Sequence, residues 1–423
     1  MAVPTLDREE VLMDLLGSPQ TGYPVIHVAG TNGKSSTTRM IDSLLRTVGL
    51  RVGRFTSPEF RLRERIALHG EAISPDYFVQ LYRDVEPYVT LTDAKFPQRL
   101  TAFEVVTAMA FAAFVDAPVD VAVVEVGMGG GWDCTNVARG TVAVLTPIGL
   151  EHQDYLGDTV EAIAAEKAAI IKPGATAVVA AQAAEAAGPI LERCAATGAT
   201  LAREGGEFGV RQRGVAVGGQ VLSLQGLGGV YDDIFLPVHG AHQAQNAAVA
   251  LAAVEAFFGA GVDRQLDVEV VRAGFAAVTV PGRLERVRSA PTVLLDAAHN
   301  PHGMAATATA VAEEFAFRRL VAVVSIPADK DVAAMLELLE PAVDVLVATR
   351  NTSPRAMPAE ELAALAVEVF GPDRVEVHPE LPDAIEAAVA LAESDTDGEL
   401  SGVGVLITGS VVTVADARRL LKR

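Results

Sequence analysis

Short apolar runs rich in β-branched residues alternate with alanine-rich helical stretches along almost the whole of this 423-residue chain. Continuous apolar runs are typical of parallel strands covered on both faces. Strands that alternate with helices predict a doubly wound, mostly parallel α/β sheet. The runs form two series, which predict strands at 24–30, 119–127 and 141–147, and then at 291–298, 320–326, 343–350 and 403–410.

Two breaks in this alternation predict the domain organisation. Between 201 and 240 the sequence changes to glycine-rich, alternating short strands, which predicts a small β-rich appendage on the first domain. The pair Pro281-Gly282 lies between the two series of strands and indicates a hinge at 281–290. We therefore expect an N-terminal domain over 1–280 and a C-terminal Rossmann-like α/β domain over 291–423.

Composition excludes several classes of partner. The formal net charge of −20 argues against nucleic acid, because a phosphate backbone needs a basic face. The two cysteines, Cys134 and Cys194, offer no disulfide or metal framework and suit a reducing compartment. The longest apolar run, 105–115, is too short to span a bilayer, and no signal peptide is visible. We expect a cytoplasmic protein with neither a nucleic-acid nor a membrane partner.

The stretch 26–36, IHVAGTNGKSS, reads as an apolar strand, a tight turn flanked by Gly30 and Gly33, and the start of a helix. Backbone N–H groups at such a helix start form an anion site. Lys34 would reach the β- and γ-phosphates of a nucleotide, and Ser35 or Ser36 could approach Mg²⁺ or a phosphate oxygen. The alternative is an ordinary turn with an exposed lysine. We interpret Gly30, Thr31, Asn32 and Gly33 as a phosphate-binding loop in which Val28 replaces the first Walker glycine.

Ordered motifs continue along nearly the whole chain, among them TSPEF, ERIALHGEAIS, EVGMGGGWDCTN, EHQDYLG, EKAAIIKPG, HGAHQAQNAA, PGRLE, LDAAHNPHG, SPRA and ITGSVV. Together with the loop they resemble the Mur ligase superfamily and its folylpolyglutamate synthase/dihydrofolate synthase branch. The resemblance implies that the N-terminal domain binds ATP through the loop. It also implies an ATP-dependent, amide-forming ligase that uses Mg²⁺.

Three polar side chains follow predicted strands and could share one divalent ion. They are the hydroxyl of Ser57, the carboxylate of Glu125 and the imidazole of His152. Taken singly, Ser57 could cap a turn, Glu125 could pair with a lysine, and His152 could be a loop histidine. In the family that the chain resembles, the matching positions bind magnesium, and two ions are expected.

Lys167 lies in a predicted helix, where the default interpretation is a surface lysine paired with Glu166. The resemblance implies instead a lysine that CO₂ converts to a carbamate, an anion that helps to hold a second Mg²⁺. This chemistry needs a neutral amine, which burial beside Ala168, Ile170 and Ile171 would favour by lowering the pKa.

The other half of the nucleotide site is expected from the resemblance. Asn246 resembles an asparagine that contacts the nucleotide, and Arg283 is placed to meet phosphate. Asp296, just past a strand, is suited to accept from ribose hydroxyls, and His299 resembles a histidine near the phosphates and the amine. Helix capping is the alternative for Asp296 and His299. The segment 408–410 resembles a part of the family near the glutamate pocket.

The chemistry implied is attack of a substrate carboxylate on the γ-phosphate of ATP, followed by attack of an amine on the acyl phosphate. By resemblance the acid is dihydropteroate or folate and the amine is L-glutamate, with 66–74 and 100–104 on the pterin side. Lys34 would spread charge during phosphate transfer, while His299 and Arg283 would stabilise the tetrahedral stage. The related folate enzymes suggest a monomer.

Several residues depart from the usual family pattern at positions that face the substrates. Glu59 replaces a histidine, Gly131 replaces an arginine, Cys134 an alanine and Glu151 an aspartate, and 325–331 lacks a usual glycine. Because Glu59 adds a negative charge and Gly131 removes a positive one, a paralogous ligase that joins a non-folate acid to a different amine is the alternative. A nucleotide-binding scaffold without catalysis is disfavoured by the joint presence of the site residues.

Overall fold

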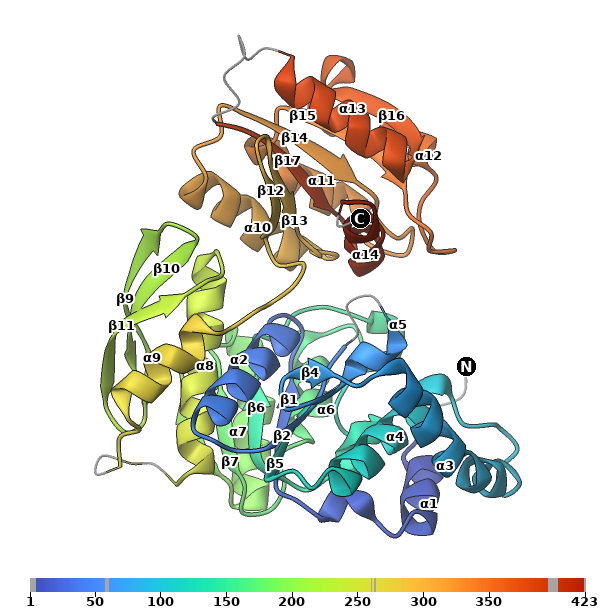
Figure 1. Ribbon diagram of the computed structural model, residues 1–423, viewed down its shortest axis with the longest axis vertical. Coiled ribbons are helices and arrows are strands. Elements are labelled where there is room, and N and C mark those ends of the chain that lie inside the picture. The colour runs from blue at the N-terminus through green and yellow to red at the C-terminus, as the bar shows by residue number, and fades with distance from the viewer. Residues whose placement is uncertain (1–4, 58–60, 260, 262–263, 395–401, 422–423) are drawn as a thin grey trace. The chain divides into compact units, whose positions relative to one another are not determined.

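The computed structural model describes residues 5–57, 61–259, 261, 264–394 and 402–421. The chain divides into two compact units, which are treated separately here (Figure 1). The first unit comprises residues 1–216, 220–237 and 243–279, and the second comprises 217–219, 238–242 and 280–423. In the described part of the chain, no helix combines the length and apolarity needed to cross a membrane.

The first unit is built on an eight-stranded sheet of order β4-β3-β2-β5-β1-β6-β7-β8. Six of its strands run parallel, whereas β3 is antiparallel to β2 and β4 is antiparallel to β3. The α/β class and the mostly parallel sheet expected from the apolar runs are therefore confirmed. The strands are β1 (Val25–Ala29), β2 (Val52–Phe55), β3 (Ile66–Leu68), β4 (Glu71–Ala72), β5 (Val121–Glu125), β6 (Gly140–Leu145), β7 (Thr176–Val179) and β8 (Thr200–Arg203).

Helices cover both faces of this sheet. One face packs against two apolar clusters, the first with side chains of α1, α3 and α4 and the second with side chains of α6 and α7. On the other side α2 packs on β1, β2 and β5, and α9 packs beside α2. The helices are α1 (Asp7–Leu15), α2 (Lys34–Thr47), α3 (Pro75–Asp93), α4 (Ala102–Asp116), α5 (Gln153–Leu156), α6 (Val160–Ala168), α7 (Ala184–Thr197), α8 (Ala241–Phe257) and α9 (Val268–Ala276).

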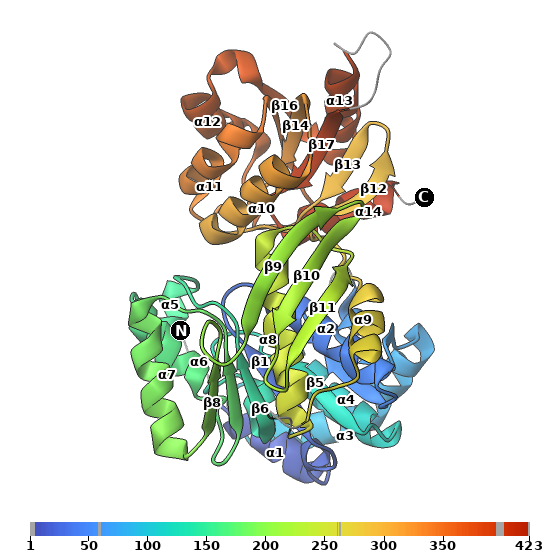
Figure 2. The same cartoon turned by 90° about the vertical axis from the view of Figure 1, so that its left-hand side faces the viewer.

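The expected β-rich appendage is a separate three-stranded antiparallel sheet of β9 (Gly209–Ala216), β10 (Gly219–Gln225) and β11 (Val230–Leu236) (Figure 2). It begins later than the predicted 201, because residues 200–203 form β8 and extend the main sheet as a parallel neighbour of β7. Strand β11 packs on α9 of the same unit. The turn between β10 and β11 is held by Glu255, whose buried carboxylate accepts from the N–H groups of Leu227 and Gly228 and from the Tyr231 hydroxyl.

The second unit has a six-stranded sheet of order β12-β13-β17-β14-β15-β16, parallel except for β12. Its apolar core lies under α10, α11 and α12, and α13 packs against β14 to β17. The elements are β12 (Glu285–Ser289), β13 (Thr292–Leu295), α10 (Pro301–Glu314), β14 (Arg319–Val324), α11 (Val332–Leu339), β15 (Val345–Arg350), α12 (Ala359–Phe370), β16 (Val375–Glu380), α13 (Leu381–Glu393), β17 (Val403–Thr408) and α14 (Val411–Leu421).

Candidate active site

The predicted phosphate loop connects the carboxyl end of β1 to the first residue of α2. Val28, at the position of the missing Walker glycine, is a fully buried member of β1 and lies opposite Glu125 of β5 in the sheet. The strand therefore continues where a longer loop would begin, and the turn itself spans Gly30 to Gly33. The first N–H groups of α2 lack partners within the helix, as at every helix start, and they face the turn.

Two glycines allow the backbone of this loop to lie against its neighbours. Gly30 has φ +144°, and a Cβ there would come within 1.9 Å of the Thr146 hydroxyl oxygen. Gly33 has φ +87°, and a Cβ there would lie 2.5 Å from Oδ1 of Asn246. The loop is thus wedged between the end of β6 on one side and α8 on the other.

Backbone hydrogen bonds fix the remaining turn. The N–H groups of Thr31 and Asn32 both donate to the Pro147 carbonyl, at 2.9 and 3.3 Å. The Thr31 hydroxyl donates to the Gly149 carbonyl and accepts from the Gly149 N–H, both at 3.1 Å. Asn246, expected to contact the nucleotide, is buried against the loop and donates to Gln243 Oε1. These contacts hold Thr31 and Asn32 in one conformation.

Two lysines converge on one carbonyl oxygen of the loop. Lys34 Nζ donates to the carbonyls of Gly30 and Thr31, at 2.9 and 3.0 Å. Lys167 Nζ, from α6, donates to the same Gly30 carbonyl at 2.8 Å. Lys167 is buried, and desolvation, followed by the nearby charge of Lys34, lowers its pKa to about 7. The expected burial is confirmed, and close to neutral pH a large fraction of this amine is uncharged.

Glu125 and Ser57 meet at the carboxyl edge of the sheet, as expected from the ends of β5 and β2. Glu125 Oε2 accepts from the Ser57 N–H at 2.9 Å, and Oε1 accepts from the hydroxyls of Ser57 and Ser35, at 3.1 and 2.8 Å. The Glu125 side chain is almost fully buried. Ser35 thus touches the carboxylate, whereas Ser36 is buried and lies 3.4 Å from Gln243 Nε2.

This donor set fits Mg²⁺. A carboxylate and two hydroxyls supply hard oxygen ligands beside a phosphate-binding loop, and Mg²⁺ in such sites completes its shell with water and phosphate oxygens. No group of three or more His, Cys, Asp or Glu side chains suited to a metal occurs in the described residues, so an ion here would depend on oxygens from outside the chain.

His152 precedes the short helix α5 and has the left-handed φ of +51°. Its Nε2 lies 3.6 Å from Oε1 of the adjacent Glu151, whose side chain is buried. The negative charge of Glu151 also reaches Lys167.

In the second unit Asp296 holds the turn that carries Arg283. Its buried carboxylate accepts from the Leu284 N–H at 2.9 Å through Oδ2, and from the Ala298 N–H and the Thr307 hydroxyl through Oδ1, at 3.0 and 2.8 Å. Leu284 has the left-handed φ of +45° although it carries a side chain, so the turn needs such an anchor. Arg283 itself donates to the Gly282 carbonyl at 3.2 Å.

His299 and Ser410 lie at the carboxyl ends of β13 and β17, which are neighbours in the sheet. His299 Nδ1 lies 2.9 Å from the Ala297 carbonyl oxygen, which can only accept, so Nδ1 carries a proton. Ser410 Oγ accepts from the Thr413 N–H and from Asn351 Nδ2, at 3.0 and 3.1 Å, and so caps α14.

The departures from the family pattern have different structural settings. Gly131 lies against Glu166, whose Oε1 accepts from the Trp132 N–H at 3.0 Å. Cys134 is buried, with its sulfur 3.2 Å from the Thr107 hydroxyl. The segment 325–331 contains Asp329, which forms an ion pair with Arg355. Glu59 lies outside the described residues.

Sequence reasoning missed the residues that support the loops of the site and are not themselves expected to contact a ligand. Thr146 and Gln243 had no signal beyond their type, because their role depends on packing between elements distant in sequence. Asn351 is buried and bridges the hydroxyls of Ser410 and Thr413. A polar residue placed directly after an apolar strand was the only available indication.

Comparison with known proteins agrees with this arrangement. The family model for the Mur ligase middle domain matches residues 28–254, and the model for the Mur ligase glutamate ligase domain matches 282–411. The chain belongs to the Mur ligase family. Among curated members, the Mycobacterium tuberculosis dihydrofolate synthase/folylpolyglutamate synthase is 54% identical over 440 residues, which cover 99% of this chain and 90% of the relative.

Solved structures of folylpolyglutamate synthases share the fold. The M. tuberculosis folylpolyglutamate synthase complexed with ADP and AMPPCP superposes with a TM-score of 0.94 at 55% identity, covering 99% of this chain and 96% of that one. A solved FPGS–AMPPCP–folate complex gives a TM-score of 0.86 at 32% identity, covering all of this chain and 96% of the other. The resemblance inferred from the motifs is confirmed.

Proposed function

We propose that this Mur ligase is an ATP-dependent folylpolyglutamate synthase that also has dihydrofolate synthase activity. It would add L-glutamate to a folate or to dihydropteroate and release ADP and phosphate. The observation that carries the proposal is the convergence of Lys34 and Lys167 on the Gly30 carbonyl, beside Glu125 and Ser57. The similarity to relatives named for these two activities, and to structures solved with ADP, AMPPCP and folate, supports these substrates.

The residues of the first unit suit the phosphate-transfer step. The α2 start and Lys34 would bind the β- and γ-phosphates, since Lys34 needs only to exchange two carbonyl oxygens for phosphate oxygens. Bound Mg²⁺, held by Glu125 and Ser57 and, as the resemblance to the family implies, by His152, would neutralise charge on the phosphates. The acid would then become an acyl phosphate, whose phosphate is a leaving group that a carboxylate lacks.

Lys167 suits carbamylation, because CO₂ reacts with the neutral amine and the pKa of this lysine lies near 7. The carbamate would be an anion in place of a cation beside the Gly30 carbonyl, and it would supply an oxygen ligand for a second Mg²⁺. The buried position of Lys167 shields the product from water.

The residues of the second unit suit the amine and the tetrahedral stage. His299, whose ring is held at Nδ1 by the Ala297 carbonyl, would accept a proton from the incoming amine. Arg283 would stabilise the developing oxyanion from the turn that Asp296 anchors. The Asp296 carboxylate already accepts three hydrogen bonds. It would accept a hydrogen bond from a ribose hydroxyl only through its remaining lone pairs.

The pterin end of the acid would lie near 66–74 and 100–104, as the resemblance implies. In this region Glu104 caps α4 with Thr101 and forms an ion pair with Arg8 at 3.0 Å. The Arg65 guanidinium stacks over the Phe103 ring, 4.9 Å from its centroid. An aromatic ring and a buried carboxylate are groups that a flat, amino-substituted heterocycle can use.

Phosphate release tests the proposal. The purified protein with ATP and Mg²⁺ would be given dihydropteroate plus L-glutamate, or tetrahydrofolate plus L-glutamate, with a no-acid control. Acid- and glutamate-dependent turnover of about 1 s⁻¹, within a decade or two, is expected of a working enzyme. A protein that binds ATP but releases no phosphate with either acid would contradict the folate assignment and favour a ligase for another acid.

A further inference from the structure

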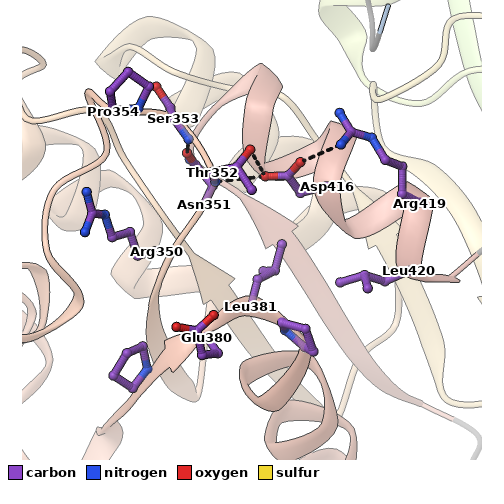
Figure 3. Close-up of a pocket in the computed structure, with 12 residues that line it drawn as sticks. Arg350, Asn351, Thr352, Ser353, Pro354, Glu380, Leu381, Asp416, Arg419 and Leu420 are labelled. Carbon is purple, nitrogen blue, oxygen red and sulfur yellow. Dashed lines mark hydrogen bonds and ion pairs between the residues drawn. The ribbon is translucent and has the colours of Figure 1, made fainter.

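A pocket of about 580 Å³ in the second unit lies away from the residues assigned above to catalysis. It opens at the carboxyl ends of β15 and β16, the edge of a parallel α/β sheet at which ligands generally bind (Figure 3). Its walls come from 350–354, 379–382 and the second half of α14. Pockets of this size commonly hold small molecules.

Among the described residues, two charged side chains of the pocket, Arg350 and Glu380, have no ion-pair or hydrogen-bond partner. Asp416 and Arg419 lie 3.5 Å apart and are three residues apart on α14, so they offset each other. Arg350 and Glu380 are register partners on adjacent strands. Within the described residues, however, neither side chain forms an ion pair or a side-chain hydrogen bond. Opposite charges placed on neighbouring strands normally pair with each other.

One wall of the pocket is rigid and polar. Asp416 is 6% exposed, and its Oδ2 accepts from the N–H and the hydroxyl of Thr352, at 2.9 and 2.8 Å. Its Oδ1 is buried and accepts no hydrogen bond from the described residues, and its ion-pair partner is Arg419, 3.5 Å away. Figure 3 shows Arg350 and Glu380 on one side of the pocket and the Thr352–Asp416–Arg419 chain on the other.

The remaining lining is apolar. Leu381 and Leu420 contribute aliphatic side chains, and Pro354, Pro379 and Pro382 add ring surfaces without N–H donors. Leu381 projects between Glu380 and Asp416 (Figure 3). The pocket therefore offers a guanidinium for a carboxylate, carboxylates for an ammonium group, and an apolar surface between them.

We infer that this pocket binds a free α-amino acid with an aliphatic side chain, as a site separate from the one proposed for L-glutamate. Arg350 would take the carboxylate, Glu380 the ammonium group, and Leu381 and Leu420 the side chain. A simple anion would leave Glu380 unpaired, and a simple cation would leave Arg350 unpaired.

The pocket touches the loop that supports Ser410. Asn351 and Thr352 are consecutive: Thr352 bonds to Asp416 in the pocket wall, and Asn351 donates to the Ser410 and Thr413 hydroxyls behind it. A ligand on Arg350, the residue before Asn351, would thus lie beside the loop that holds the start of α14. This gives the site a physical route to the C-terminal half of the catalytic machinery.

Calorimetric titration of the full chain with L-leucine, without nucleotide or acid, tests the inference independently of turnover. Matched probes are 3-methylbutylamine, which lacks the carboxylate, and 4-methylpentanoate, which lacks the ammonium group. We expect leucine to bind more tightly than either. Arg350→Gln and Glu380→Gln should each weaken leucine binding about tenfold or more, since each loses a charge-assisted hydrogen bond.

Arg211→Gln, at an exposed arginine on β9, is the matched control and should leave leucine binding unchanged. Because Arg350 and Glu380 are exposed, their variants should fold and keep the phosphate-release activity of the parent. The inference is overturned if leucine does not bind, or if it binds equally to the parent and both variants. Loss of leucine binding in Ser410→Ala, with competition by L-glutamate, would place leucine in the amine site and would also overturn it.

Discussion

The buried amine of Lys167 should make the stability of the first unit depend on pH in a way that one substitution removes. In the folded chain its pKa is about 7, against an ordinary value of 10.5 that the unfolded chain should retain. Between these values the unfolded chain binds more protons, so stability rises with pH; below pH 7 both states are protonated and the contribution is flat. A shift of this size corresponds to at most about 5 kcal/mol across the whole window.

The assay is urea unfolding between pH 6.5 and 9.5 in CO₂-depleted buffer, followed by the fluorescence of Trp132. This residue is the only tryptophan in the chain, and its backbone N–H donates to the side chain of Glu166, the residue before Lys167. Relative to Lys167→Met, the parent should gain about 3 kcal/mol of unfolding free energy between pH 7 and 9.5. Loss of the hydrogen bond to Gly30 lowers the unfolding free energy of the variant by a similar amount at every pH. It therefore does not change how that free energy depends on pH.

Lys95→Met, at an exposed lysine on the same unit, is the control and should follow the parent at each pH. If the difference in stability between the parent and Lys167→Met stays constant from pH 6.5 to 9.5, the amine is not neutralised by folding. The argument for a carbamate at this position would then lose its chemical basis.

Three further changes test other parts of the site. Gly33→Ala should cost about 2 kcal/mol and abolish nucleotide binding, because its Cβ would lie 2.5 Å from Asn246 Oδ1 at φ +87°; unchanged binding by calorimetry would refute the wedged loop. Glu125→Gln should raise the Mg²⁺ concentration for half-maximal phosphate release at least about tenfold; an unchanged Mg²⁺ titration would remove Glu125 from the metal site. Asp296→Ala should destabilise the second unit by about 3 kcal/mol, since Leu284 N–H and two other donors lose their acceptor. A variant of normal stability by hydrogen exchange that fails to bind ATP would show that Asp296 acts on the nucleotide alone.

The sequence was informative wherever one local pattern determines the structure. The apolar runs identified the main strands, and the loop motif located the turn between β1 and α2, because strand burial and glycine spacing are local properties. The meeting of Ser57 and Glu125 was also foreseeable, since parallel strands bring their carboxyl ends to one edge. Burial of Lys167 followed from its apolar neighbours.

What the sequence could not supply were contacts that depend on packing between distant segments. The hydrogen bond from Lys167 to Gly30 joins residues 137 positions apart, and nothing local to either predicts it. Asp296 was expected to face a ribose, yet its oxygens are engaged by Leu284, Ala298 and Thr307, a role that only the turn geometry makes visible. Residues 201–203 were assigned to the appendage because a short alternating strand has the same pattern in either sheet.

The position of Val28 means that the main sheet fixes the distance between the phosphate loop and the Glu125 carboxylate. Val28 belongs to β1 and is the register partner of Glu125 in β5. The hydrogen bonds between these two strands therefore set the separation between the loop and that carboxylate. One residue inserted between Val28 and Gly30 would shift the position of Lys34 relative to Glu125. The same insertion at Val217, which is 96% exposed in the turn between β9 and β10, would lengthen only a surface turn. Variation in chain length should therefore be tolerated in the appendage and excluded at the end of β1.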